Sequence, residues 1–219
     1  MPSIIEVDTI KNKTGTQNTV LSTDGSGNNT LNANTIKDGS ATKTLAEYAS
    51  SAWSWGAGVP EGTVLQVKSQ TKTTVALMSG TSAENFQDIS GLSVDITPKT
   101  GSNVLVLTSI CAGATMSLQH AFRIVRGSDT IGVGTGASDR PAAGWSFWAT
   151  ATNELNHTHY HFLDESPGGD GSTTKTYKVQ VNIETSGSNT FSLNASKSDS
   201  DNYYTPRGIS IITVMEIAS

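Results

Sequence analysis

Three of the four histidines, His157, His159 and His161, stand at alternate positions in one short segment. On a β-strand these imidazoles would share one face, while Tyr160 and Phe162 would share the other. In a trimer whose strands meet at the threefold axis, His157 and His159 of each chain would offer six imidazoles to an iron or similar ion. The alternative interpretation places Tyr160 and Phe162 in the core and leaves the histidines in solvent or at a subunit boundary.

A second group of candidate residues follows Arg140. On a strand covering 145–152, Trp145 and Phe147 share one face and Trp148 points from the other. At least one large aromatic is therefore expected in an interface or at an exposed recognition surface. Trp148, with Arg140 nearby, is a candidate for ligand recognition.

Two adjacent tyrosines define a third candidate, in the segment Asp199-Ser-Asp-Asn-Tyr-Tyr-Thr-Pro-Arg207. Tyr, Asn and Ser are typical of adaptable binding loops, in which rigid aromatic rings stack on sugars or side chains at low entropy cost. Tyr203, Tyr204 and Arg207 are the recognition residues on this interpretation. The alternative is that both tyrosines cap the core before the last strand.

Catalytic patterns are weak in this chain. Ser, His and Asp are present, but no Gly-x-Ser-x-Gly elbow singles out a triad, and the glycine-rich run 131–136 lacks the lysine and helix of a phosphate-binding loop. Two acid pairs, Asp164 with Glu165 and Asp199 with Asp201, would suit glycoside hydrolysis at a separation of about 5 to 9 Å, but both stand in loop-like sequence. The single cysteine, Cys111, is predicted to be a small buried hydrophobe. We expect a protein that is not an enzyme.

Composition limits the partners. With 219 residues, 21 glycines, a net charge of -5 and only 15% charged residues, the chain has no basic patch for phosphate, so nucleic acid is not expected as a partner. No stretch approaches the roughly 20 consecutive apolar residues of a membrane span, so no membrane insertion is expected. The start Met1-Pro-Ser-Ile-Ile-Glu6 does not resemble a signal peptide, which predicts synthesis in the cytosol.

The N-terminal part is too polar to fold alone. Residues 11–44 are mostly Thr, Asn, Ser and Gly, and their burial would not offset a backbone entropy cost of roughly 1 to 2 kcal/mol per residue. Residues 4–14 and 30–40 align, with Thr-Ile-Lys recurring, which indicates fibrous β structure unless the likeness is chance. Between the copies, the segment 23–29 has the Asp-Gly and Gly-Asn pairs of a tight turn, flanked by Leu21 and Leu31. Other chains are expected to order this segment.

A short helix is predicted over 44–53. Thr44 and Glu47 form a capping-box pattern, but about ten residues are too few for a stable isolated helix. The helix is therefore expected to pack on its symmetry mates. The residues predicted for this interface between copies are Leu45, Tyr48, Ala52, Trp53 and Trp55. The glycine-rich segment that follows predicts a boundary between an anchoring or shaft segment, 1–58, and a head domain, 59–219.

From residue 62 onward the apolar period is two, which predicts an all-β head of about ten strands. Short Gly, Ser, Asp and Pro loops without intervening helices favour an antiparallel β-sandwich of jelly-roll type. The segments 104–107 and 209–215 are apolar on both faces. Such strands need a second sheet on one side and another cover, such as a neighbouring subunit, on the other.

Several of these segments together resemble tail-fibre or fibre-like structural proteins of marine bacteriophages, including those that infect cyanobacteria. The resemblance covers nearly the whole chain. The segments that carry it are Ile4-Ile-Glu-Val-Asp-Thr-Ile10, the turn 22–27, the strand entry 62–67, the strand 88–98 and the ending 207–217.

The resemblance implies a homotrimer located in the virion tail and synthesised in the host cytoplasm. Its N-terminus would dock on other tail proteins through Ile4, Ile5, Val7 and Ile10. Its β domain would attach to a host-surface glycan or protein, with Tyr203, Tyr204, Arg207, Trp148 and Arg140 as host-binding candidates. No catalytic residue and no cofactor is implied, apart from the open question of an axial metal. The alternatives are a capsid or tail decoration protein without receptor binding and a polysaccharide-degrading tail protein.

Overall fold

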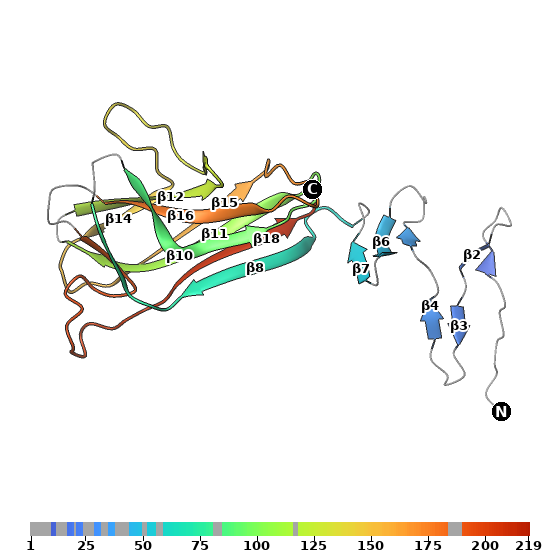
Figure 1. Ribbon diagram of the computed structural model, residues 1–219, viewed down its shortest axis with the longest axis horizontal. Helices are drawn as coiled ribbons and strands as arrows, with labels where there is room; N and C mark the ends of the chain where they lie inside the picture. Colours follow the sequence, from blue (N-terminus) through green and yellow to red (C-terminus); the bar gives the residue numbers. More distant parts are fainter. Residues whose placement is uncertain are drawn as a thin grey trace. The chain divides into compact units, whose positions relative to one another are not determined.

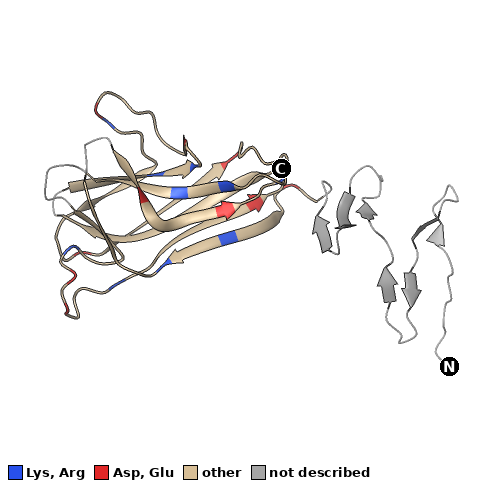
Figure 2. Ribbon diagram, viewed as in Figure 1, with Lys and Arg blue, Asp and Glu red and all other residues tan. Residues whose placement is uncertain are grey.

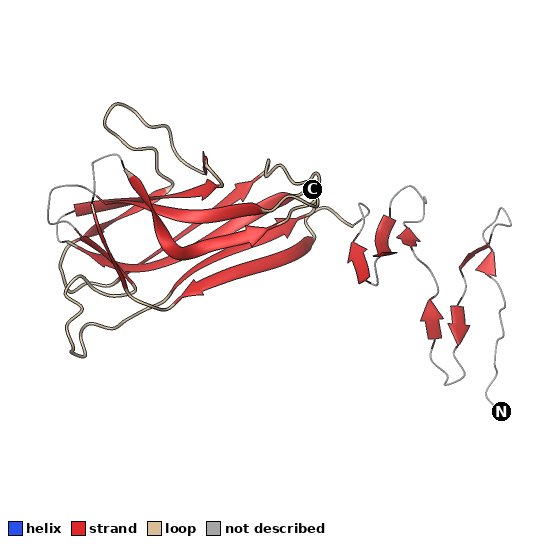
Figure 3. Ribbon diagram, in the orientation of Figure 1, coloured by secondary structure: helices blue, strands red, loops and turns tan. Residues whose placement is uncertain are grey.

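The computed structural model describes short strands within residues 10–55 by their backbone, and then residues 59–80, 85–115, 118–183 and 190–219. Contacts divide the chain into two compact units, Met1–Pro60 and Glu61–Ser219. The division falls two residues after the predicted boundary at residue 58. Every regular element in the described residues is a β-strand, as Figure 3 shows. The predicted all-β class is therefore confirmed.

The first unit consists of short antiparallel pairings. β1 (Ile10–Lys11) pairs with β2 (Gln17–Thr19), β3 (Leu21–Thr23) pairs with β4 (Asn29–Leu31), and β5 (Thr35–Lys37), β6 (Thr44–Ala49) and β7 (Ala52–Trp55) form a three-stranded sheet. Leu21 is the register partner of Leu31, the pair predicted to flank a turn. The recurring Thr-Ile-Lys triplet contributes the first strand of a pair in both copies, β1 and β5.

Residues 44–49 and 52–55 form strands, where a helix over 44–53 was predicted. β6 pairs with β5 on one side and with β7 on the other, with Tyr48 opposite Trp53. A helix of about ten residues has a costly nucleus and few hydrogen bonds to offset it. Tyr, Trp and Thr favour extended backbone, and pairing with two neighbours satisfies the polar groups on both edges of β6.

The described residues of the second unit form eleven strands. Figure 1 labels the longer ones. The eleven strands are β8 (Val64–Lys72), β9 (Ala76–Ser79), β10 (Phe86–Ile96), β11 (Asn103–Ala114), β12 (Leu118–Arg126), β13 (Asp129–Ile131), β14 (Trp145–Ala149), β15 (Asn156–Asp164), β16 (Lys175–Ile183), β17 (Thr190–Leu193) and β18 (Ser210–Ile217). The sequence predicted about ten strands. The strand β13 is only three residues long and forms a hairpin with β12 across a two-residue turn at Gly127.

The eleven strands form two antiparallel sheets. One sheet has the order β10, β16, β12, β13, with β14 also paired to β12. The other has the order β8, β18, β11, β17, β9, with β15 paired to the free side of β11. The first and last long strands, β8 and β18, are therefore neighbours.

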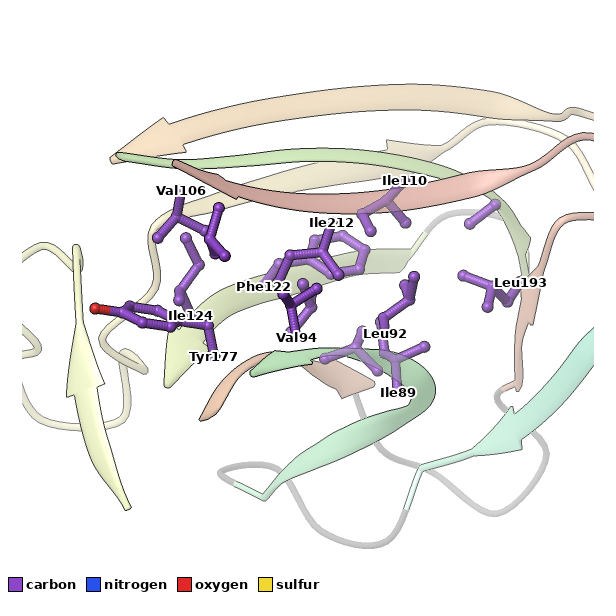
Figure 4. Close-up of a cluster of buried hydrophobic side chains, with 14 of the residues drawn as sticks. Ile89, Leu92, Val94, Val106, Ile110, Phe122, Ile124, Tyr177, Leu193 and Ile212 are labelled. Atoms are coloured by element: carbon purple, nitrogen blue, oxygen red, sulfur yellow. The ribbon is translucent and has the colours of Figure 1, made fainter. Parts of the chain in front are cut away.

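One hydrophobic core joins the inward faces of both sheets (Figure 4). Leu92, Val94 and Ile96 of β10 are buried in alternation with exposed residues, as the period of two predicted. Val106 and Ile212 of the opposite sheet belong to the same cluster. Cys111 is free and buried, in agreement with its predicted structural role. The core holds the strand ends, and thus the loops, in place.

Candidate recognition surface

The two ends of the head unit meet at one end of the sheets. The Gly62 amide donates a hydrogen bond to the Ala218 carbonyl oxygen at 2.7 Å, and the Ala218 amide donates to Thr63 at 2.9 Å. Because β18 is antiparallel to β8, Ser210 at the start of β18 is the register partner of Lys72 at the end of β8. The loop before β18, residues 194–209, therefore lies at the opposite end from the chain entry, as Figure 1 shows.

Asn194 anchors this loop. It is fully buried with φ at 63°, and its side-chain amide donates to the carbonyl oxygens of Lys72 (2.8 Å) and Thr74 (3.0 Å). Its side-chain oxygen accepts a hydrogen bond from the buried Ser210 hydroxyl at 2.7 Å. The Gly208 amide donates to the Asn194 backbone oxygen at 2.9 Å, so both ends of the loop are tied to one residue. Asn is among the few side chains that tolerate a left-handed backbone.

The tip of the loop carries the two candidate tyrosines. Tyr203 is 83% exposed and Tyr204 is 65% exposed, so the alternative in which they cap the core is wrong. Their ring centroids are 3.7 Å apart, and their hydroxyl groups are in hydrogen-bond contact. The Tyr204 amide donates to the side-chain oxygen of Asn202 at 2.9 Å, which holds the backbone at the tip. The loop thus presents a paired aromatic surface to solvent.

Arg207 does not project freely from this loop. Its guanidinium donates two hydrogen bonds to Asp199, at 3.0 and 2.9 Å. This fork closes the base of the tip and lowers the pKa of Asp199 below its ordinary value. Sequence reasoning missed the role of Asp199 as the partner of Arg207, because their spacing of eight residues becomes a contact only when the loop folds back.

Trp148, on the outer face of the other sheet, and Arg140 are both close to Gln119. Trp148 is 53% exposed and is the register partner of Gln119. Arg140 lies in the β13–β14 loop and lines a hollow of about 560 Å³, together with Gln119, Asp139 and Ser146. The volume lies within the roughly 300 to 1,000 Å³ of small-ligand sites. The tyrosine loop contacts the connection after β14 through a hydrogen bond from Ser198 to Thr152 of 3.0 Å.

The other two aromatic residues of β14 belong to the core side. Trp145 stacks between Phe122 and Tyr160, with centroid distances of 5.2 and 4.7 Å. Phe147 packs against Phe122 and Phe191. The predicted division of the segment into an inward and an outward face is therefore confirmed.

The histidines lie along β15, an edge strand whose partner in the described residues is β11. His157, His159 and His161 are exposed, while Tyr160 and Phe162 pack against the core. The rings of His157 and His159 are 4.6 Å apart, and His157 Nε2 is 2.7 Å from the Ser109 hydroxyl. Among the described residues of one chain, no three His, Cys, Asp or Glu side chains converge on a common point.

Two of the four candidate acids, Asp164 and Asp199, are engaged in structural contacts. Asp164 is buried and accepts hydrogen bonds from Arg126, at 2.9 and 2.7 Å, and from the Tyr177 hydroxyl, at 2.7 Å. Burial and the neighbouring Asp164 raise the pKa of Tyr177. Asp199 is held by Arg207. The structural contacts of Asp164 and Asp199 account for both residues without a catalytic role.

The remaining predicted site residues lie in the first unit. Ile4, Ile5 and Val7 fall outside the described residues, and Ile10 is in β1. The residues predicted for a helical trimer interface lie on strands: Leu45 and Tyr48 in β6, and Ala52, Trp53 and Trp55 in β7. Any interface that they form is therefore built from strands.

Comparisons with known proteins do not assign the chain to a family. No protein-family model matches the chain, and no curated protein matches it. Within the described residues, no helix has the length and apolar character needed to cross a membrane.

Proposed function

We propose that this chain is a non-enzymatic bacteriophage tail fibre protein, a homotrimer whose N-terminal unit docks on other tail proteins and whose head attaches to the host surface. The observation that carries the proposal is the position of the exposed Tyr203–Tyr204 pair at the end of the head opposite to the chain entry. A head fixed to the virion at its entry end would present this pair outward. The location of the protein, on this proposal, is the virion tail after synthesis in the host cytoplasm.

The proposed head fold is a jelly-roll β-sandwich. The order becomes clear when the eight longest strands of the head are renumbered one to eight along the chain. They are β8, β10, β11, β12, β14, β15, β16 and β18. The pairings then give the order 1-8-3-6 in one sheet and 2-7-4-5 in the other. This order supports two nested Greek keys, an architecture that recurs in viral capsid and lectin domains.

The ligand proposed for the tip is a host-surface glycan or protein. Adjacent exposed tyrosines offer flat apolar faces with polar edges, which suit the faces and hydroxyl groups of sugars. Their neighbours in the loop, Ser200 and Asn202, supply uncharged hydrogen-bonding groups. Trp148 and the hollow at Arg140 are a secondary contact region in this proposal. The proposal needs no cofactor, and an axial metal held by histidines of several copies stays open.

The test is binding of the fluorescently labelled full-length chain to marine cyanobacterial cells and to their purified envelope polysaccharide. The double variant Tyr203→Ala/Tyr204→Ala should lose at least tenfold in affinity, since stacking of an aromatic side chain is the main proposed contact. Val64→Ala, which removes an exposed apolar side chain at the entry end, is the matched control and should bind normally.

Three results would point elsewhere. If the unmodified chain binds only virus particles that lack it, a decoration protein is the correct reading. If the polysaccharide becomes shorter during incubation, the protein is a depolymerase. If the double variant binds cells as tightly as the unmodified chain, the tyrosine tip is not the attachment site.

A further inference from the structure

The outer faces of the two sheets differ in charge. On the sheet that contains β10, β16 and β12, Asp88 and Lys178 form an ion pair of 2.7 Å, and Arg123 donates to Gln180 at 2.7 Å. Asp95 on the same face accepts a hydrogen bond from Thr176 at 2.6 Å. Figure 2 shows acidic and basic positions along strands of the head. A face with these charged side chains is suited to exposure to solvent.

On the other sheet, no acidic, lysine or arginine side chain is among the described outward residues of β15, β11, β18 and β8 in the rows given next. Register places its outward residues in three rows across β15, β11, β18 and β8. The rows are Leu163, Leu105, Met215 and Val67; His161, Leu107, Thr213 and Ser69; and His159, Ser109, Ile211 and Thr71. We call this surface the histidine face. The lysines of β8, Lys68 and Lys72, are opposite Val214 and Ser210 and so alternate to the other side.

The histidine face leaves apolar side chains in water. Val67 is 51% exposed and Leu163 is 40% exposed, and Leu105, Leu107, Ile211 and Met215 are partly exposed. A hollow of about 310 Å³ lies between Leu107, His159, His161 and Ile211. The strands β11 and β18 are therefore apolar on both faces but covered on one. Contiguous exposed apolar surface of this kind marks interaction sites.

The absence of fixed charges from the described outward residues of this face favours another copy of this chain as the occupant. In a cyclic oligomer the same surface of each subunit turns toward the axis, so fixed charges on it would meet their own kind. The histidine face has no such charges, whereas the outer face of the other sheet has several. Of the two broad faces of the head, the histidine face is the one compatible with its own copies.

The three rows are smaller than a complete interface. Four strands spaced about 4.8 Å apart are about 19 Å wide, and residues 211–215 of β18, which the rows include, extend about 17 Å. The flat footprint is then about 320 Å², against the roughly 800 Å² per partner of a stable interface. Contacts between copies must therefore extend beyond the three rows.

We propose that the histidine face is the surface by which each head packs against other copies of this chain. The inference rests on the proposed homotrimer and names the surface that forms it. It assigns a structural role to the apolar residues Leu105, Leu107, Met215 and Val67, and it puts the three histidines of β15 at the border between subunits.

Two charge insertions in the full-length chain test this. Val67→Glu changes a side chain that is already half exposed, and Leu107→Glu changes the centre of the face. Ser93→Glu, on the exposed side of β10 opposite Lys178, is the matched control. Light scattering over a wide concentration range gives the mass of each species, and circular dichroism reports whether each variant is folded.

The unmodified chain and Ser93→Glu should have three times the 22.9 kDa chain mass at every concentration. Both face variants should dissociate at concentrations at least 100-fold higher than the unmodified chain does. If Leu107→Glu does not fold, Val67→Glu decides alone. A persistent trimer in the folded face variants would overturn the histidine face and leave the trimer standing. A monomeric unmodified chain would overturn the proposed trimer itself.

Discussion

At the residue scale, His120 is a polar side chain in an apolar environment. It is fully buried on β12 between Phe147 and Phe191, and within the described residues neither ring nitrogen has a hydrogen-bond partner. Burial lowers the pKa of His120 from 6.5 to about 4. The folded head therefore holds this imidazole neutral, at the cost of leaving two polar atoms unpaired.

This burial predicts a loss of stability in acid. Because the pKa of His120 is lower in the folded chain, its contribution is complete above pH 6.5 and is lost as the pH falls toward 4. Between pH 7.5 and pH 5 the free energy of unfolding should fall by about 2 kcal/mol on this account alone. In His120→Leu that part of the fall should disappear. Urea titrations of both proteins at the two pH values, at one protein concentration, measure it. Equal falls in both proteins would contradict the assignment.

At the scale of elements, the loop 194–209 depends on Asn194. Replacing Asn194 with Ala removes three side-chain hydrogen bonds and leaves the Lys72 and Thr74 oxygens without this donor. It also puts a less tolerant residue at φ 63°. We expect a loss of about 3 kcal/mol in the free energy of unfolding and faster proteolysis between residues 198 and 207. The measurement is limited proteolysis followed by mass spectrometry.

Asn202→Ala is the control for this loop. Asn202 is exposed at the tip, and its side-chain oxygen accepts a hydrogen bond from the Tyr204 amide, so the substitution should cost about 1 kcal/mol, clearly less than Asn194→Ala, and speed proteolysis only at the tip. Equal sensitivity of the two variants would mean that the loop is held by its tip rather than by its buried base.

At the scale of the whole molecule, the head unit has the contacts of an independent domain. Its core draws on both sheets, and its entry and exit segments are hydrogen-bonded to one another. Residues 61–219 alone should therefore unfold in one cooperative transition. If the histidine face forms the oligomer, this fragment should also stay trimeric without residues 1–60. Light scattering with and without a chelator checks both the mass and the open question of an axial metal. A folded but monomeric fragment would move the source of trimerisation to the N-terminal unit.

The sequence by itself determined the alternation of the head strands. The period of two in the segments of β10 and β16 was enough to predict the buried side of each, because a strand has only two faces. Alternation also predicted that Trp148 would point away from Trp145. Similarly, β11 and β18 are apolar on both faces, which predicted that both faces are covered. The sequence did not determine which face packs against the second sheet.

Tertiary structure alone decided which residues meet. The contact of Arg207 with Asp199, the rows of the histidine face and the position of the tyrosine tip opposite the chain entry all depend on strand order and register, which local patterns do not encode. The segment 44–53 gives the same lesson. Its capping-box pattern predicted a helix, but neighbouring strands supplied hydrogen-bond partners that a short isolated helix could not match.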